Sequence, residues 1–227
     1  MEELSIKVIG IGGVGTIFCD KLLRFLNYGN TPSNVTLVDG DIFEQKNLPR
    51  QDFSDDGNKA VSKTVSLRSK YDKVRITPKD CYVDQNNISS IMGENDIVCV
   101  CVDNHKTRKV ISDYAFKLKN VVVISGGNEL TDGNVQIFVR REGENLTPSL
   151  TDYHPEISEP KDKLPTEMSC EELSSSEPQL FFTNLGVATF MCFAFYNVIT
   201  RKDHKYSEVY FDIEQMKADS KIRKPIG

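Results

Sequence analysis

The sequence has no tryptophan and no surplus of basic residues. Its six cysteines form no Cys-x-x-Cys motif. Zinc sites built from paired thiolates use such motifs, so no structural zinc is expected. The 28 lysines and arginines are outnumbered by 33 aspartates and glutamates, which gives a net charge of −5. That charge does not favour binding to a nucleic-acid backbone, and no nucleic-acid partner is expected.

No secretory leader is expected, because a strand-like apolar run begins almost at Met1. We therefore expect a cytoplasmic protein with free thiols. One apolar run, residues 180–199, approaches the length of a membrane span. It contains Asn184 and Asn197 and closely follows Pro178. We interpret it as a helix buried in the core and in a subunit interface, and we expect no membrane partner.

A glycine-rich stretch, Gly10-Ile11-Gly12-Gly13-Val14-Gly15, follows an apolar run at residues 6–9 and precedes apolar residues at helical spacing. A strand, a glycine turn and a helix start let the backbone approach phosphate closely and point the helix N-terminus at the anion. A second apolar run, residues 35–38, ends in Asp39 about twenty residues later, which suits a ribose contact. These features predict a nucleotide in contact with Gly10, Gly12, Gly13, Gly15 and Asp39.

Continuous apolar runs alternate with helix-like stretches over the first half of the chain. Such runs are typical of parallel strands in a sheet that is covered on both faces. We predict one α/β domain over residues 1–227, with a Rossmann-like, mostly parallel sheet, helices on both faces and an antiparallel extension. The expected strands are residues 6–9, 34–38, 74–77, 96–102, 121–124, 135–140 and 208–213, and the expected helices are residues 14–25, 59–69, 86–92, 105–118 and 180–199.

The composition changes at Arg141. Residues 142–178 carry charges, prolines and serines and show little apolar periodicity. So long a loop in a compact domain usually has a function or is disordered, and we describe it as a long crossover loop. Residues 217–227 are polar and are expected to form a flexible tail.

Polar residues gather where the predicted strands end, which is where ligands bind in open α/β sheets. Two cations and a further carboxylate suit a triphosphate better than the dinucleotide of an oxidoreductase. Arg50 and Lys63 are suited to neutralise phosphate oxygens and the departing pyrophosphate, and Asp103 to hold a bridging Mg²⁺. The whole group comprises Asp39, Asn47, Arg50, Gln51, Lys63, Asp103 and Asn104.

Taken in order, these motifs resemble the ThiF/MoeB/HesA superfamily of ubiquitin-activating-enzyme-like adenylyltransferases. Besides the glycines and Asp39-Gly40-Asp41, the stretch Asn47-Leu48-Pro49-Arg50-Gln51 resembles an Asn-x-x-Arg-Gln element, with Lys63 twelve positions after Gln51. The stretch Asp103-Asn104-His105-Lys106-Thr107-Arg108 resembles an Asp-Asn-x-x-x-Arg element. The similarity covers residues 6–199, and residues 178–184 are similar to ThiF-type proteins encoded in bacterial operons beside ubiquitin-like partners.

The resemblance implies a reaction. The family joins the C-terminal carboxylate of a small β-grasp protein to AMP, using ATP and Mg²⁺. We therefore expect a homodimeric adenylyltransferase whose partner is a ubiquitin-like or sulfur-carrier-like protein with a C-terminal glycine. Sulfur transfer and protein conjugation both stay open. By resemblance, Asp39 binds ribose, Asn47, Arg50 and Lys63 contact the phosphates, Gln51 supports Arg50, and Asp103 serves Mg²⁺.

Several assignments stay open in the sequence. Lys59 competes with the preferred Lys63, because Gly57 allows a shifted alignment. Arg108 either joins the site or braces a strand–helix junction. Cys170 is the candidate thioester nucleophile, although its acidic neighbours raise a thiol pKa and an unreactive loop cysteine is the alternative. The alternatives for the whole chain are a degenerate, non-catalytic scaffold and, less favoured, an NAD(P)-dependent oxidoreductase.

Overall fold

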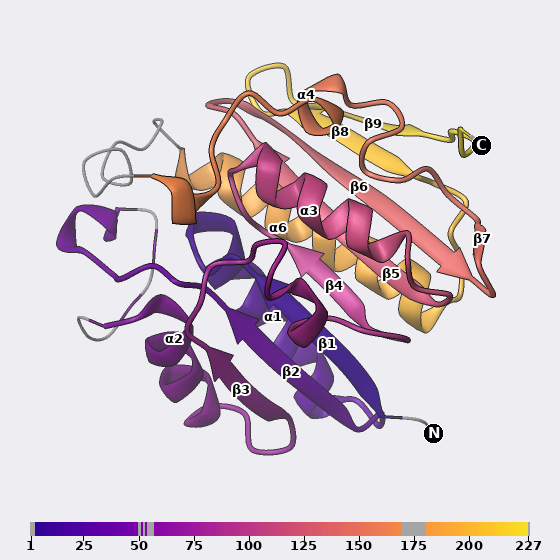
Figure 1. The fold of residues 1–227 in the computed structure, drawn as a ribbon. Helices are drawn as coiled ribbons and strands as arrows, with labels where there is room; N and C mark the ends of the chain where they lie inside the picture. The colour runs from indigo at the N-terminus through magenta and orange to yellow at the C-terminus, as the bar shows by residue number, and fades with distance from the viewer. Residues whose placement is uncertain (1–2, 50, 52, 54–56, 169–179, 227) are drawn as a thin grey trace.

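The computed structural model of the chain describes residues 3–49, 51, 53, 57–168 and 180–226. Their strands form one nine-stranded sheet in the order β3-β2-β1-β4-β5-β6-β8-β9, with β7 paired to β6 (Figure 1). The first five strands are parallel, and the pairs from β5·β6 onward are antiparallel. The strands are β1 Leu4–Ile9, β2 Ser33–Val38, β3 Arg75–Lys79, β4 Ile97–Val100, β5 Val121–Asn128, β6 Asp132–Arg141, β7 Glu144–Asn145, β8 Glu208–Asp212 and β9 Lys217–Lys221.

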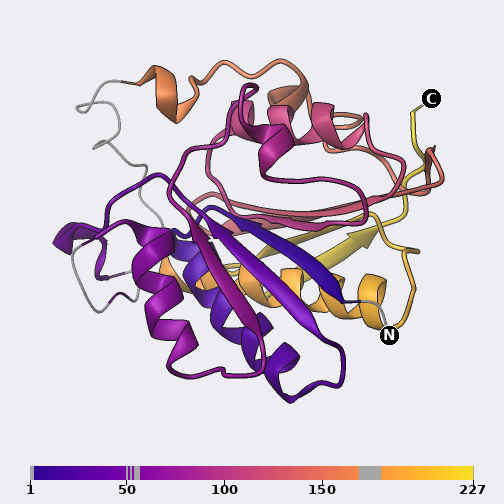
Figure 2. The same cartoon turned by 60° about the horizontal axis from the view of Figure 1, so that its bottom comes forward.

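Helices cover both faces of the sheet, as Figure 2 shows. The helices on one face are α1 (Gly13–Tyr28), α2 (Lys59–Arg68) and α6 (Phe181–Phe195), which ends in a π-helical turn, Tyr196–Thr200. The other face carries α3 (His105–Ala115), α4 (Pro155–Ser158) and the 3₁₀ turn Ile88–Ser90. Two further 3₁₀ turns are Gln45–Asn47 and Pro165–Glu167. The predicted fold class is therefore confirmed.

The four central parallel strands were predictable because they are buried on both faces. All four residues of β4 are buried, and the adjoining Cys99 and Val100 belong to the core clusters of opposite faces. Such a strand has no solvent side, so its sequence is a continuous apolar run rather than an alternating one.

Three expectations differ from the structure. β3 continues through Pro78 instead of ending there, and it can do so because it is an edge strand. The expectation of an irregular tail from residue 217 is wrong for Lys217–Lys221, which forms β9 against β8. β9 has no apolar residue larger than Ala218, so the sequence carried no strand signal. Within the long loop, Leu150, Ile157 and Leu164 are buried in the core beside α3.

α6 and its π-helical turn, Phe181–Thr200, are long and apolar enough to cross a membrane by length and composition alone. Half of the most apolar stretch is buried, and Val187 and Met191 pack in the core against the sheet. Core packing therefore accounts for one side of this helix. Phe182, Phe193 and Tyr196 on the other side are exposed.

The strand order places one crevice for a ligand. β1 lies between β2 and β4, so the connections leaving β1 and β4 diverge to opposite sides of the sheet. In open α/β sheets, ligands bind outside the carboxyl ends of the strands at this point. The glycine turn after β1 and the turn after β4 are located there.

Candidate nucleotide-binding site

The turn between β1 and α1 can be built only with glycine at two positions. Gly10 has a φ of +90°, and a Cβ on it would lie 2.9 Å from the backbone of Cys101 and Val102. A Cβ on Gly15 would lie 2.0 Å from the carbonyl oxygen of Gly10. These contacts hold the end of β1 against the end of β4 and the first turn of α1 against β1. The glycines therefore serve close packing as well as access for a ligand.

The N-terminus of α1 follows this turn directly, and it carries no acidic residue. Its N-cap is Gly12, which has no side chain to accept a hydrogen bond, and no acidic residue lies in its first turn. A helix of 16 residues with free N–H groups at its start attracts anions through those groups and through its dipole. Among the residues that the structure describes, a Cβ on Gly12 would meet only Gln51 Nε2, at 3.8 Å.

Asp39 ties the end of β2 to the glycine turn. Its Oδ2 accepts a hydrogen bond from the N–H of Ile11 at 2.5 Å, and its Oδ1 accepts one from the N–H of Asp41 at 2.8 Å. Burial raises the pKa of Asp39 to about 6, although the charge of Lys59 and the two N–H groups oppose the rise. Each carboxylate oxygen can accept a second hydrogen bond, so the turn leaves capacity for a ribose hydroxyl.

Lys59 lies beside the two aspartates at the end of β2. It is 6% exposed and forms an ion pair with Asp41, and its charge also acts on Asp39. Asn58 positions it: the side chain caps α2 by accepting from the N–H of Val61 at 3.0 Å and donates to the carbonyl oxygen of Asp39 at 2.8 Å. The first turn of α2 is thereby fixed to the carboxyl end of β2.

Lys63, the lysine that the sequence favoured, lies elsewhere in α2. It is 2% exposed, and its charge lowers the pKa of the Cys19 thiol in α1, where burial dominates and raises that pKa to about 12. Of the two lysines, the structure brings Lys59 to Asp39 and Asp41. The spacing of twelve residues from Gln51 did not identify this, because the connection before α2 fixes which lysine occupies the first helical turn.

Gln51 supplies a buried polar group aimed at the glycine turn. It is 7% exposed, its amide nitrogen points to Gly12, and its Oε1 has no hydrogen-bond partner among the described residues. Its backbone N–H donates to Asn47, whose Oδ1 accepts from the N–H of Glu44 at 3.1 Å. Asn47 thus shapes the loop that carries Gln51. Arg50, predicted to contact phosphate, lies outside the described residues, as does Cys170.

The end of β4 leads into α3 through Asp103 and Asn104. Asp103 is exposed, whereas Asn104 is buried and caps α3 by accepting from the N–H of Thr107 at 2.7 Å. Asn104 Nδ2 also donates to the carbonyl oxygen of Lys163. The structure therefore gives Asn104 a capping role at the edge of the site, while Asp103 faces solvent.

Arg108 braces two strand ends. Its guanidinium donates to the carbonyl oxygens of Val102 at 2.6 Å and Gly126 at 2.9 Å, which joins the ends of β4 and β5. Burial lowers the pKa of Arg108, and the nearby charge of Asp103 opposes that shift. These contacts match the bracing alternative proposed from the sequence.

The structure thus gathers Asp39, Asp41, Lys59 and Gln51 around the glycine turn and places Asp103 at the neighbouring strand end. Lys63 lies one turn further along α2, where its charge acts on the Cys19 thiol of α1. Among residues 3–49, 51, 53, 57–168 and 180–226, no cluster of three His, Cys, Asp or Glu side chains is suited to hold a metal ion. Mg²⁺ is commonly bound by one or two carboxylates together with substrate phosphates, so Asp103 alone fits that mode of binding.

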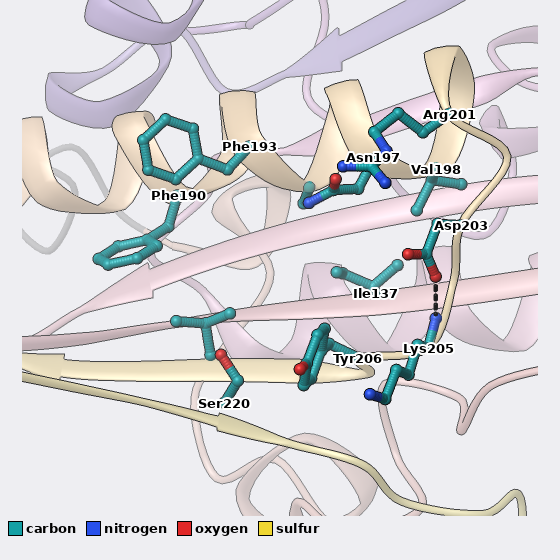
Figure 3. A pocket seen from close by; sticks show the side chains of 12 residues that line it. Ile137, Phe190, Phe193, Asn197, Val198, Arg201, Asp203, Lys205, Tyr206 and Ser220 are labelled. Atoms are coloured by element: carbon teal, nitrogen blue, oxygen red, sulfur yellow. Dashed lines mark hydrogen bonds between the residues drawn. The ribbon is translucent and has the colours of Figure 1, made fainter.

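A hollow of about 310 Å³ lies away from these residues, between the second half of α6 and strands β6, β8 and β9 (Figure 3). Its inner wall is apolar, with Phe190, Phe193 and Ile137, and its mouth carries Arg201 and Lys205. None of the candidate nucleotide-binding residues lines it. The nucleotide site is therefore assigned from hydrogen bonds, charge and strand topology rather than from the size of a hollow.

Comparison with known proteins gives matches over the whole chain and over part of it. The profile of the ThiF family matches residues 1–225. The molybdopterin-synthase adenylyltransferase of Escherichia coli is 26% identical over 148 residues, which are 63% of this chain and 57% of that protein. The adenylyltransferase and sulfurtransferase MOCS3 of Drosophila virilis is 30% identical over 142 residues, 61% of this chain and 30% of that protein. The chain thus spans little more than half the length of the bacterial relative.

Solved structures with the same fold include MccB of E. coli bound to MccA, with a TM-score of 0.76 at 15% identity, covering 98% of this chain and 64% of that one. MccB solved with ATP gives a TM-score of 0.75 at 16% identity, covering 98% and 64%. PaaA gives a TM-score of 0.69 at 16% identity, covering 96% and 64%. These likenesses establish the fold.

Proposed function

Because the chain belongs to the ThiF family, we propose that it is an ATP-dependent adenylyltransferase that activates the C-terminal carboxylate of a small partner protein. The observation that supports this most directly is the glycine turn. It combines an α1 N-terminus without an acidic cap, a buried Gln51 amide without a partner for its Oε1, and the Asp39 carboxylate. Together these groups fit a ribose and a chain of phosphates.

In the proposed reaction, a carboxylate oxygen of the partner attacks the α-phosphorus of ATP, the bond to the bridging oxygen breaks, and pyrophosphate leaves with that electron pair. No general base is needed because the carboxylate is already ionised. Catalysis then consists of positioning and charge neutralisation. We assign the neutralising roles to Arg50 by resemblance and to Lys59 by position, and the Mg²⁺ role to Asp103.

ATP–pyrophosphate exchange tests this assignment, with small proteins that end in glycine and are encoded near the gene as partners. We expect exchange in the wild type and a loss of at least about 100-fold in Arg50→Ala and Lys59→Ala, because each removes a cation from the phosphates. Lys63→Ala, in the same helix, decides which lysine neutralises the phosphates, because the sequence favours Lys63 and the ion pair with Asp41 favours Lys59. Exchange in the wild type no greater than in Arg50→Ala would reject the proposal.

The competing functions predict different outcomes of the same assays. A non-catalytic scaffold would be stabilised thermally by ATP but would form no adenylate. An oxidoreductase would bind a reduced nicotinamide cofactor, detected by fluorescence, and would not bind ATP. The adenylyltransferase proposal requires both ATP binding and adenylate formation.

For the partner, we propose a ubiquitin-like or sulfur-carrier-like β-grasp protein that ends in glycine and meets this chain in the cytoplasm. Support comes from the family and from a relative named as an adenylyltransferase of molybdopterin synthase. We also propose that the Cys170 thiolate can attack the acyl carbon of the adenylate, which forms a thioester and releases AMP. A covalent adduct that is lost in a reducing gel and absent in Cys170→Ala would support that step, and an adduct that persists in Cys170→Ala would reject it.

We propose a homodimer that uses the exposed side of α6. The stretch Phe181–Thr200 contains no charged residue, and Phe182, Phe193 and Tyr196 are exposed on it. Phe25 of α1 lies against Tyr196 with a ring separation of 6.3 Å, which extends the apolar surface. A monomer in sedimentation equilibrium would reject this proposal. In a dimer, Phe193→Asp should favour the monomer because it places a charge in the interface.

A further inference from the structure

The carboxylate of Asp162 fills the N-terminus of α3. It accepts hydrogen bonds from the N–H groups of His105 at 2.6 Å and Lys106 at 3.1 Å. These are among the N–H groups at the start of a helix that have no partner within the helix. A carboxylate at this position is also favoured by the helix dipole. Asp162 therefore binds α3 as an external anion would.

Three further contacts hold the neighbouring segment, Asp162–Glu167, to the same helix turn. The carbonyl oxygen of Lys163 accepts from Asn104 Nδ2, and Lys106 Nζ lies 2.7 Å from a carboxylate oxygen of Glu167. Leu164 is buried in the core cluster that includes α3. The segment thus crosses the start of α3 with a charged contact at each end and an apolar residue between them.

Asp103 comes directly before Asn104 and the first turn of α3, which the segment Asp162–Glu167 contacts. Its backbone leads into Asn104, which is held by both the capping bond and the bond to Lys163, and then into the N–H groups bound by Asp162. Asp103 itself is exposed. Its position is therefore determined by its neighbours along the chain rather than by packing of its own side chain.

We propose that Asp162 is a positioning residue for the nucleotide site. By filling the N-terminus of α3, it fastens Asp162–Glu167 across the end of β4, fixes the backbone that carries Asp103, and leaves α1 as the helix that receives phosphate. The role of Asp103 in this inference rests on the proposed function. The fastening of the segment does not.

The test compares wild type, Asp162→Ala, Asp162→Asn and the control Lys106→Ala in the full chain. Trypsin cleavage after Lys161 and Lys163 is followed by mass spectrometry under native conditions, where cleavage follows the population of opened segment. Because residue 162 is close to both cleaved bonds, each rate is divided by the rate for the same variant unfolded in urea. Two bonds to a charged group are lost in Asp162→Ala, so cleavage should rise about tenfold or more. Asp162→Asn keeps the shape of the side chain and one hydrogen-bond acceptor, so its cleavage rate should lie between those of wild type and Asp162→Ala. Lys106→Ala removes an exposed ion pair and should change cleavage by less than about threefold.

The second readout is the Mg²⁺ concentration that gives half-maximal stabilisation of the protein by ATP in thermal unfolding. This concentration should rise several-fold in Asp162→Ala, recover partly in Asp162→Asn and stay unchanged in Lys106→Ala. Asp162 binds the backbone close to Asp103, whereas the Lys106 side chain pairs with Glu167. Equal cleavage and equal Mg²⁺ dependence in Asp162→Ala and Lys106→Ala would overturn the inference. A wild type that ATP and Mg²⁺ do not stabilise would overturn the proposed function, while the cleavage comparison would still test the fastening.

Discussion

The N-termini of α1 and α3 point to the same edge of the sheet, but they differ in how their first N–H groups are bound. α3 is capped by Asn104 and filled by the carboxylate of Asp162, so its first N–H groups are used within the molecule. α1 begins after Gly12, which has no side chain, and no acidic residue lies in its first turn. A stable domain gains nothing from an uncapped helix end, so the difference indicates that α1 is kept open for a ligand.

The largest loss of stability and of ATP binding is expected when a side chain at Gly15 clashes with the backbone of the glycine turn. In Gly15→Ala, the new methyl group would lie 2.0 Å from the carbonyl oxygen of Gly10, and only a backbone shift can relieve that contact. We expect a loss of at least about 3 kcal/mol in unfolding free energy and no detectable ATP binding. Urea unfolding and calorimetry measure both. Gly93→Ala is the control, since nothing lies within 4 Å of its Cβ. An unchanged urea midpoint in Gly15→Ala would show that the turn is not as closely packed as described.

Gly12→Asp makes α1 resemble α3. Its backbone has a φ of −87°, and a Cβ there has space, so an aspartate fits as an N-cap. The new carboxylate would occupy the anion site and repel phosphate, and we expect ATP affinity to fall roughly 100-fold. Stability should rise by about 0.5–1 kcal/mol because a cap is added.

Gly12→Ala separates the two causes, because it adds a similar Cβ without a carboxylate. It should keep ATP affinity within about threefold of the wild type. If Gly12→Ala and Gly12→Asp lost affinity equally, volume rather than anion competition would be the reason. The comparison between the two helix ends would then lose its functional meaning.

The pH dependence of stability and of ATP binding tests the role of Asp39 beside the N-terminus of α1. In the folded state its pKa is raised to about 6, mainly by burial, from a usual value of 3.8. A carboxyl group with a raised pKa contributes stability below its unfolded pKa and loses it as pH rises through the folded pKa. The wild type should therefore lose about 2 kcal/mol of stability relative to Asp39→Asn between pH 4 and pH 7. Any constant difference between the two proteins reflects the amide NH₂ of the variant, which meets one of the two N–H groups that Asp39 binds.

Nucleotide binding should change in the other direction. The ionised carboxylate accepts hydrogen bonds from ribose hydroxyls, so ATP affinity of the wild type should fall as pH drops below about 6. Asp39→Asn should bind ATP weakly at every pH. A stability difference between the two proteins that stays constant from pH 4 to pH 7 would contradict the raised pKa of Asp39.

The sequence predicted the elements that have a periodic or continuous apolar signal and missed those that depend on tertiary contacts. β4 and β5 were predictable because burial on both faces leaves only apolar residues in their centres, and β1 and β2 because their buried positions carry isoleucine, valine and leucine. β9 was not, because its alternation sets Ala218 and Ser220 against charged residues.

The site shows the same division. The glycines and Asp39 follow a local motif, and they lie together at the turn between β1 and α1. Lys59 was ranked below Lys63 because the count of residues through a loop does not fix the start of the next helix. Asp162 was missed because it is 57 residues from the N–H of His105 that it binds, and no local pattern connects them.

The smallest predicted effect concerns His154, which lies in the same long connection between β7 and α6 as Asp162. His154 lies between two carboxylates, with Nδ1 2.8 Å from Glu156 and Nε2 3.0 Å from Glu208, and Arg223 also pairs with Glu208 at 2.8 Å. Burial disfavours the charged imidazole, but the hydrogen bonds to Glu208 and Glu156 outweigh it and raise the pKa of His154. Its contribution to stability is therefore complete below about pH 6.5 and is lost as pH rises through the folded pKa.

We expect His154→Gln to be less stable than the wild type by on the order of 1 kcal/mol at pH 6, with the difference shrinking toward pH 8.5, because the variant has no charge to lose. Urea unfolding at the two pH values measures this. Glu208→Gln should reduce the pH dependence more than Glu156→Gln, since Glu208 is almost fully buried while Glu156 is exposed to solvent. If the difference between wild type and His154→Gln stays constant with pH, His154 contributes to stability through neutral hydrogen bonds and not through its charge.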